Sequence, residues 1–105
     1  MRRLTLGTII ARRELRYDDA DRGEHPVEVL IGLPFESVAG SEWSCPWQIV
    51  GLGNEEIRTG HGIDAFQALQ IAMKMIGVNL YVRSDKGSRL RWLDSGPGDC
   101  GFPWE

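Results

Sequence analysis

One short stretch of the sequence combines glycine, histidine and a carboxylate at a spacing that could do chemistry. Residues 60–65, GHGIDA, spell G-x-G-x-x-A, the pattern with which a dinucleotide-binding strand turns into a helix. Two features argue against such a site. The preceding residues 55–59, EEIRT, are too polar for a strand buried on both faces. Asp64 would also place a carboxylate where the pyrophosphate must sit. We expect instead a turn that leads into the N-cap of a helix.

A second chemical possibility is a nucleophile activated by His61. Asp64 lies close to it in the sequence, and Ser44 or Cys45 could complete a triad. The spacing of these residues matches no known signature, and a histidine in a turn before a helix usually serves as a hydrogen-bonding residue. Cys45 alternates with two tryptophans, which predicts a buried thiol with a raised pKa, the reverse of what a nucleophile needs. We therefore predict no catalytic residue and favour a protein that is not an enzyme.

Metal binding and disulfide bonding receive no better support. His25, His61, Cys45 and Cys100 are the potential metal ligands, and they show no C-x-x-C or H-x-x-x-H spacing. We predict no metal and no cofactor. The apolar residues 4–11 follow two arginines and resemble a short export signal, but a small-x-small cleavage site is missing. The expected location is therefore the cytoplasm, where both cysteines stay reduced.

Length and charge limit the class of protein further. The chain has 105 residues, enough for one domain. We place this domain at residues 1–93 and expect an irregular tail, rich in glycine and proline, at residues 94–105. Lys and Arg number 12 against 15 Asp and Glu, and the net charge of −3 argues against binding to nucleic acid. No apolar run approaches the roughly 20 residues of a membrane helix, so we expect no membrane association.

Short strands must position most of these residues. The alternation of apolar and polar side chains predicts strands at Leu4–Arg16, Val27–Phe35, Trp43–Leu52, Glu55–Thr59 and Arg89–Leu93. The second strand would carry all its odd-numbered residues, from 27 to 35, on one apolar face. In the third strand, Trp43 and Trp47 share a face, which predicts core positions for both. Trp104, in the irregular tail, is the best candidate among the tryptophans for contact with a partner.

The clearest element is a helix that begins after Asp64, a good N-cap residue. An apolar stripe follows at helical spacing: Ala65, Leu69, Ala72 and Ile76, flanked by Phe66, Ala68, Met73 and Met75. The apolar arc is wide, so we expect the helix to be covered on more than one side. Residues 78–83 fit either a continued helix or a strand, and we favour a helix that frays within this stretch.

The order of these elements predicts an α+β fold. We expect an antiparallel sheet of about four or five strands, connected as a meander, with the helix at about residues 64–80 packed on one face.

Two blocks of sequence carry a family resemblance. Residues 43–49, WSCPWQI, and residues 62–72, GIDAFQALQIA, are followed by Ile76, Gly77 and Leu80. The chain resembles a family of small uncharacterised bacterial proteins with a W-x-C-x-aromatic-x-I strand and a helix that opens with G-[VI]-D-[AS]-x-Q-A-L. The resemblance covers about residues 27–93 and implies that the helix continues to Leu80. It implies no activity and no catalytic residue. Gln67 is the one polar motif residue that could bond a neighbouring loop or a partner.

These observations favour a non-catalytic protein-binding module, comparable in type to a toxin-neutralising immunity protein or to a subunit of an assembly. Its partner would be another protein or further copies of the chain. The alternative is a small-ligand binder or an enzyme, with a pocket between sheet and helix near His61 and Asp64. The residues expected to contact a ligand or partner are Trp43, Trp47, His61, Asp64, Gln67 and Trp104.

Overall fold

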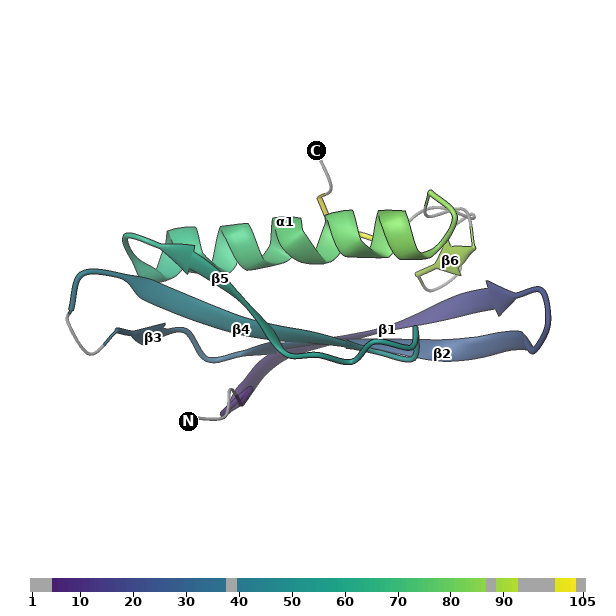
Figure 1. The fold of residues 1–105 in the computed structure, drawn as a ribbon, viewed down its shortest axis with the longest axis horizontal. Helices are drawn as coiled ribbons and strands as arrows, with labels where there is room; N and C mark the ends of the chain where they lie inside the picture. Colours follow the sequence, from purple (N-terminus) through teal and green to yellow (C-terminus); the bar gives the residue numbers. More distant parts are fainter. Residues whose placement is uncertain (1–4, 38–39, 87–88, 93–99, 104–105) are drawn as a thin grey trace.

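The computed structural model describes residues 5–37, 40–86, 89–92 and 100–103. Within these residues the elements are β1 (Ile9–Asp19), β2 (Gly23–Gly32), β3 (Phe35–Glu36), β4 (Trp43–Val50), β5 (Arg58–Gly62), α1 (Ala65–Arg83) and β6 (Leu90–Arg91). They form two layers: an elongated, twisted sheet and a single helix that lies along one face of it (Figure 1). The predicted α+β class is therefore confirmed.

The sheet is antiparallel throughout. β1, β2, β4 and β5 are neighbours in chain order, and β6 returns to the other side of β1. β3 pairs with the first residues of β4, beyond the part of β4 that pairs with β2, and Phe35 lies opposite Ser44. Trp47 pairs with Ile31 on one side and with Arg58 on the other, so β5 forms the edge of the sheet beyond β4. This arrangement confirms the predicted meander.

The core fills the space between the sheet and the helix. The face of β4 predicted to be buried carries Cys45, Trp47 and Ile49, each at most 1 % exposed. α1 faces β4 and β5 with a narrow stripe at a spacing of four residues: Ala68, Ala72, Ile76 and Leu80. The other buried apolar residues of this cluster come from β1, β2 and β6: Leu15, Val27, Val29, Ile31 and Leu90.

The bounds of the first two strands differ from the sequence prediction. β1 begins at Ile9 and continues to Asp19. Leu4, the predicted first residue, lies outside the described residues. β2 starts earlier than predicted and ends at Gly32, and the expected apolar face stops there, because Leu33 is 54 % exposed and Phe35 is 46 % exposed. The cause is a tertiary contact: the N-terminal segment crosses at this point, and the Leu33 amide donates to the Thr8 carbonyl at 2.7 Å.

The helix and the strand before it also depart from expectation. β5 covers residues 58–62 rather than Glu55–Thr59, so the glycine-rich stretch is a strand and not a turn. α1 continues to Arg83 and settles the ambiguity at residues 78–83 in favour of the helix. Phe66, expected beside the buried stripe, is 81 % exposed. The last strand is shortened to Leu90–Arg91, and Leu93 lies outside the described residues. In the described part of the chain, none of the helices has the length and apolar character needed to cross a membrane.

Candidate functional site

Asp64 and Gln67 have a structural role at the start of α1. The Asp64 carboxylate accepts a hydrogen bond from the Gln67 amide at 2.7 Å, which makes Asp64 the N-cap as predicted. The Gln67 side-chain oxygen accepts in turn from the Ile63 amide at 2.8 Å. These two reciprocal bonds resemble a capping box. They bring together two predicted site residues and satisfy backbone donors, so neither side chain needs a partner molecule to explain it.

Gly60 and Gly62 explain the G-x-G spacing of the same stretch. Both are buried and lie beneath the first turns of α1. A Cβ atom at Gly60 would come within 2.6 Å of the Ala72 nitrogen, and one at Gly62 within 2.5 Å of the Ala68 nitrogen. The glycines therefore permit a close approach of helix and strand. This is a packing role, and it differs from the cradling of a phosphate.

His61 lies between these glycines and points to the opposite face of the sheet. Its Nδ1 atom is 3.1 Å from the Ser44 hydroxyl and 2.9 Å from a Glu42 carboxylate oxygen. A catalytic relay needs the nucleophile on one ring nitrogen and the carboxylate on the other. Here both groups share Nδ1, and the side chains of His61 and Glu42 are at least half exposed. The cluster therefore has the residue types of a triad without its geometry.

Cys45 is separated from His61 by the sheet itself. His61 is paired with Ser44 in the register, so the next β4 residue faces the helix instead. Desolvation by burial raises the pKa of the Cys45 thiol to about 11, which confirms the direction expected from the sequence. The thiol remains protonated at neutral pH and is a poor nucleophile.

The tryptophans singled out in the sequence are not grouped at one site. Trp47 is 1 % exposed in the core, and its indole nitrogen is buried without a hydrogen-bond partner among the described residues. Trp43, the first residue of β4, is half-buried and packs against the core cluster. Trp104 lies outside the described residues. Trp43 and Trp47 thus lie in or against the hydrophobic core.

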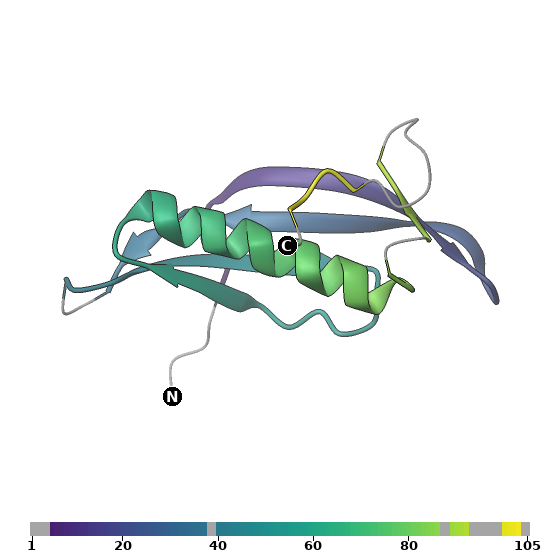
Figure 2. The ribbon, with the colours of Figure 1, turned by 90° about the horizontal axis from the view of Figure 1, so that it is seen from above.

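A cavity between sheet and helix lies away from His61. It has a volume of about 220 Å³, and its lining is mainly apolar, with Leu69 and Met73 of α1 opposite β1 and β2. Phe102 lines its rim, where residues 100–103 run beside α1 above β1 and β2 (Figure 2). The Arg13 guanidinium lies 3.9 Å from the Trp92 ring centroid and 4.7 Å from that of Phe102. No sequence signal separates this arginine from its exposed neighbours.

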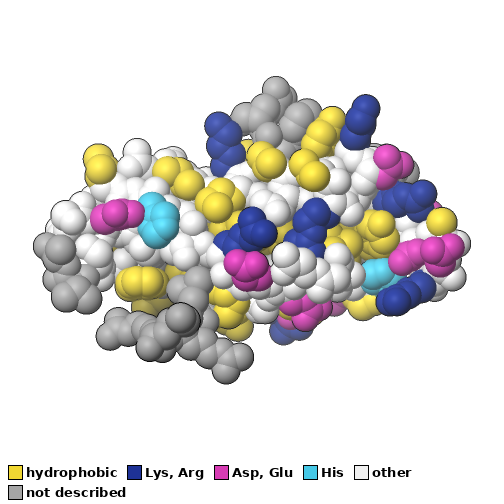
Figure 3. All heavy atoms as spheres, in the orientation of Figure 1, with side chains coloured by type: hydrophobic (Ala, Val, Ile, Leu, Met, Phe, Trp, Pro, Cys, Tyr) yellow, Lys and Arg dark blue, Asp and Glu magenta, His cyan; other side chains and the backbone are white. Residues whose placement is uncertain are grey.

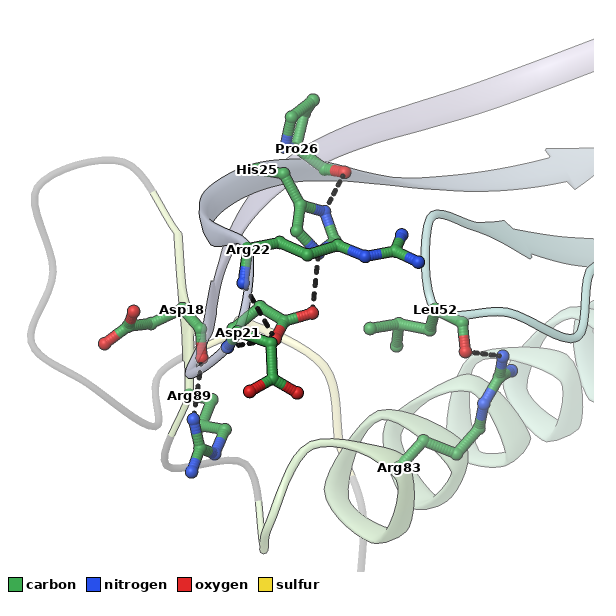
Figure 4. A network of polar contacts seen from close by, with 9 residues as sticks. Asp18, Asp21, Arg22, His25, Pro26, Leu52, Arg83 and Arg89 are labelled. Atoms are coloured by element: carbon green, nitrogen blue, oxygen red, sulfur yellow. Dashed lines mark hydrogen bonds and ion pairs between the residues drawn. The ribbon is translucent and has the colours of Figure 1, made fainter.

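Polar contacts hold the turn between β1 and β2 and the loop after β4, near the C-terminal end of α1 (Figure 4). Arg83, in the last turn of α1, donates to the carbonyls of Leu52 at 3.1 Å and of Asn54 at 2.7 Å. In the turn between β1 and β2, backbone amides of Asp21 and Arg22 donate to the Asp19 carboxylate. The bond from Asp21 is the main reason that the pKa of Asp19 lies below its ordinary value. These contacts position loops and form no concave site.

The outer surface of α1 is the feature that sequence analysis did not identify as a site. Four apolar residues follow one another along one flank of the helix, and we call them the α1 stripe: Ile71, Met75, Val78 and Val82. Val82 is 70 % exposed, Val78 40 % and Ile71 36 %. The space-filling view shows apolar side chains gathered along the layer that contains the helix (Figure 3). The signal in the sequence is a second apolar repeat beside the buried one.

Comparison with known proteins assigns a family without assigning an activity. No curated protein and no solved structure matches the chain. A family described as a domain of unknown function, DUF6968, matches residues 11–104. Because this match runs from within β1 through β6 and the described C-terminal residues, and so covers most of the chain, the chain belongs to the DUF6968 family.

Proposed function

We propose that this protein is a non-catalytic protein-binding module that binds through the outer surface of α1. The observation that carries the proposal is the concentration of exposed apolar side chains at one helix. Phe66 and Ile63, at its N-terminal end, are about as exposed as Val82 at its C-terminal end. Single exposed apolar residues are ordinary on protein surfaces, whereas contiguous apolar patches mark interaction sites.

The chemistry of His61 and Cys45, the candidate catalytic residues, supports binding over catalysis. The shared Nδ1 of His61 offers no proton relay, and the protonated Cys45 thiol is buried on the other face. The proposal includes a role comparable in type to that of an immunity protein or an assembly subunit, a bacterial origin and a cytoplasmic location.

A comparative capture experiment tests the binding role. Phe66→Ser and Val78→Ser each remove an exposed apolar side chain from α1. Leu33→Ser is the matched control, because Leu33 is also an exposed apolar residue and lies in the link between β2 and β3, outside the helix. Tagged wild type and variants would be incubated with host lysate, and co-purifying proteins quantified by mass spectrometry. The proposal expects at least one protein that Leu33→Ser retains and an α1 variant loses. Equal recovery with every variant would contradict it.

The cavity favours a second candidate function, the binding of a small apolar ligand. Its volume of about 220 Å³ exceeds the roughly 150 Å³ of an apolar cavity known to bind benzene. The sequence placed such a pocket near His61 and Asp64, whereas this cavity is lined by residues of β1 and β2 and by neither of those two. Met73→Trp would fill the cavity. A hydrophobic ligand that raises the melting temperature of wild type and not of Met73→Trp would support this function.

A further inference from the structure

The cavity between the sheet and α1 combines an apolar lining with two arginines. Seven of its nine lining residues are apolar, among them Val29, Leu69 and Met73. The other two are Arg12 and Arg13, which are neighbours in β1. None of the described residues that line the cavity is acidic. A ligand with an apolar body would therefore meet positive charge there and no negative charge.

The side chains of the two arginines lie on opposite faces of the sheet. Because side chains alternate along a strand, Arg13 shares the face of Leu15, which is buried between the sheet and the helix. Arg12 points to the outer face, where its guanidinium forms an ion pair with Glu28. The ring of Phe102 both lines the cavity and contacts the Arg13 guanidinium. Arg13 is therefore the cation on the cavity's side of the sheet.

In the described part of the chain, no carboxylate balances the charge of Arg13. The ion pairs of these residues do not include it. Its Nη1 atom donates to the neutral Cys100 carbonyl at 3.2 Å. The contacts with Trp92 and Phe102 involve ring faces and use no hydrogen-bond donor. Since a guanidinium has five N–H donors, several can still serve an anion.

The surroundings of Arg13 hold its guanidinium in place before a ligand binds. Its Cζ atom lies 3.9 Å from the ring centroid of Trp92 and 4.7 Å from that of Phe102. Gly101 has a φ of +77°, and a Cβ atom at this position would collide with the guanidinium and with Trp92. Glycine thus allows the C-terminal segment to pass close to the arginine. A cation fixed in this way loses little freedom when it binds an anion.

We infer that the cavity binds a small monocarboxylic acid, with its carboxylate on Arg13 and its apolar body against Leu69 and Met73. A guanidinium matches a planar carboxylate, which can accept two parallel hydrogen bonds from it. Because Glu28 already neutralises Arg12, one positive charge is available, and it balances a carboxylate better than a dianionic phosphate. This inference rests on the apolar-ligand function proposed above and names the class of ligand.

The volume of the cavity limits the body of the acid. About 220 Å³ exceeds the roughly 150 Å³ of a cavity that binds benzene. An acid with one aromatic ring and a short chain suits this volume, whereas a long acyl chain is too large for it. Hydrocinnamate, a phenyl ring on a three-carbon acid, is therefore a suitable probe. Hydrocinnamamide is its neutral counterpart and has nearly the same shape.

Isothermal titration calorimetry of the full chain near neutral pH compares the two compounds. Wild type should bind hydrocinnamate at least about tenfold more tightly than hydrocinnamamide, because hydrogen bonds between charged groups are the stronger ones. Added salt should weaken the binding of the acid and leave that of the amide nearly unchanged. Met73→Trp, which fills the cavity, should abolish the binding of both compounds.

Variants of the two neighbouring arginines locate the charge. Arg13→Gln should reduce the preference for the acid over the amide to about twofold or less. Arg12→Gln is the matched control and should keep the preference, because Arg12 is paired on the outer face. Arg13→Lys should keep part of it, since lysine retains the charge without the paired donors. A merely structural role for Arg13 would weaken both compounds alike and leave their ratio unchanged.

Folding of each variant is checked by circular dichroism, and the wild-type comparison of acid, amide and salt depends on no variant. Toluene, an apolar ring without a polar group, is the third probe. If wild type binds toluene but neither hydrocinnamyl compound, or binds the acid and the amide equally, the acid class is wrong and the apolar-ligand function stands. If none of the three binds at millimolar concentration, both are wrong. An Arg13→Gln protein with the full preference for the acid would also overturn the inference.

Discussion

Gly60→Ala should destabilise the protein through the contact between β5 and α1. The added Cβ would lie 2.6 Å from the Ala72 nitrogen, where ordinary contacts begin at 3.4 Å. The helix must therefore move away by about 0.8 Å at this point. The nearest atoms all belong to the backbone of Ala68 and Ala72, so no side chain can rotate to relieve the clash. Gly60 has no positive φ, and the effect should come from packing alone.

Overpacking of a core typically costs about 1–3 kcal/mol, and a clash with helix backbone belongs in the upper half of that range. We expect the free energy of unfolding to fall by about 2–3 kcal/mol, which lowers the melting temperature by roughly 10–20 °C in a domain of this size. Urea unfolding followed by circular dichroism measures the change. His61→Ala, at the next position of the same strand, is the matched control and should cost less than about 1 kcal/mol because its side chain is exposed.

A double variant tests whether the clash involves the backbone of the helix. Ala72→Gly removes a side chain from the helix but none of the backbone atoms that the new Cβ would meet. It should not restore the stability lost in Gly60→Ala, and it should add its own cost of about 1 kcal/mol as a helix-interior glycine. Restoration by Ala72→Gly would refute the backbone clash. So would a Gly60→Ala protein within about 0.5 kcal/mol of wild type, because the close approach would then tolerate a methyl group.

Three further outcomes can be measured on the same protein. Asp64→Ala removes the N-cap and should lower the free energy of unfolding by about 1 kcal/mol, whereas Asp64→Asn should retain most of it. At pH 8, the Cys45 thiol should react with iodoacetamide much faster in urea than in the native state. Because the folded pKa of this thiol, about 11, exceeds the ordinary 9.0, the contribution of the neutral thiol to the free energy of unfolding is complete below pH 9 and is lost between pH 9 and 11. Arg83→Met should leave the carbonyls of Leu52 and Asn54 without their donor and speed hydrogen exchange of amides in that loop, and an unchanged exchange pattern would contradict the bridging role.

The elements with strong local signals were predictable from sequence. The alternation around Cys45 and Trp47 gave the buried face of β4, because each apolar residue falls two positions from the last. Asp64 identified the start of α1, since a short carboxylate before an apolar helical repeat has few other roles. These features depend on the residue and its close neighbours in the chain, and the fold does not override them.

The features that escaped prediction depend on contacts between distant segments. The period-two pattern of β2 and β3 is continuous in the sequence, but the crossing of the N-terminal segment at Gly32 breaks the strand and leaves Leu33 exposed. β5 is polar and glycine-rich, so its own residues predict a turn, and only the helix above it explains why Gly60 lies in a strand. For the same reason Arg13 could not be distinguished from its exposed neighbours until Phe102 and Trp92 were placed beside it.

The two glycines also determine what α1 offers to a partner. Because Gly60 and Gly62 lack side chains, the helix lies close over β5 and needs only alanines at its nearest positions, Ala68 and Ala72. The larger apolar residues of the helix are then free to occupy other directions, and Ile71, Val78 and Val82 of the stripe are exposed. A surface built in this way is fixed by backbone contact along its inner side, so it loses little freedom on binding. Gly60→Ala should accordingly weaken any contact made through the α1 stripe as well as the fold, whereas His61→Ala should affect neither.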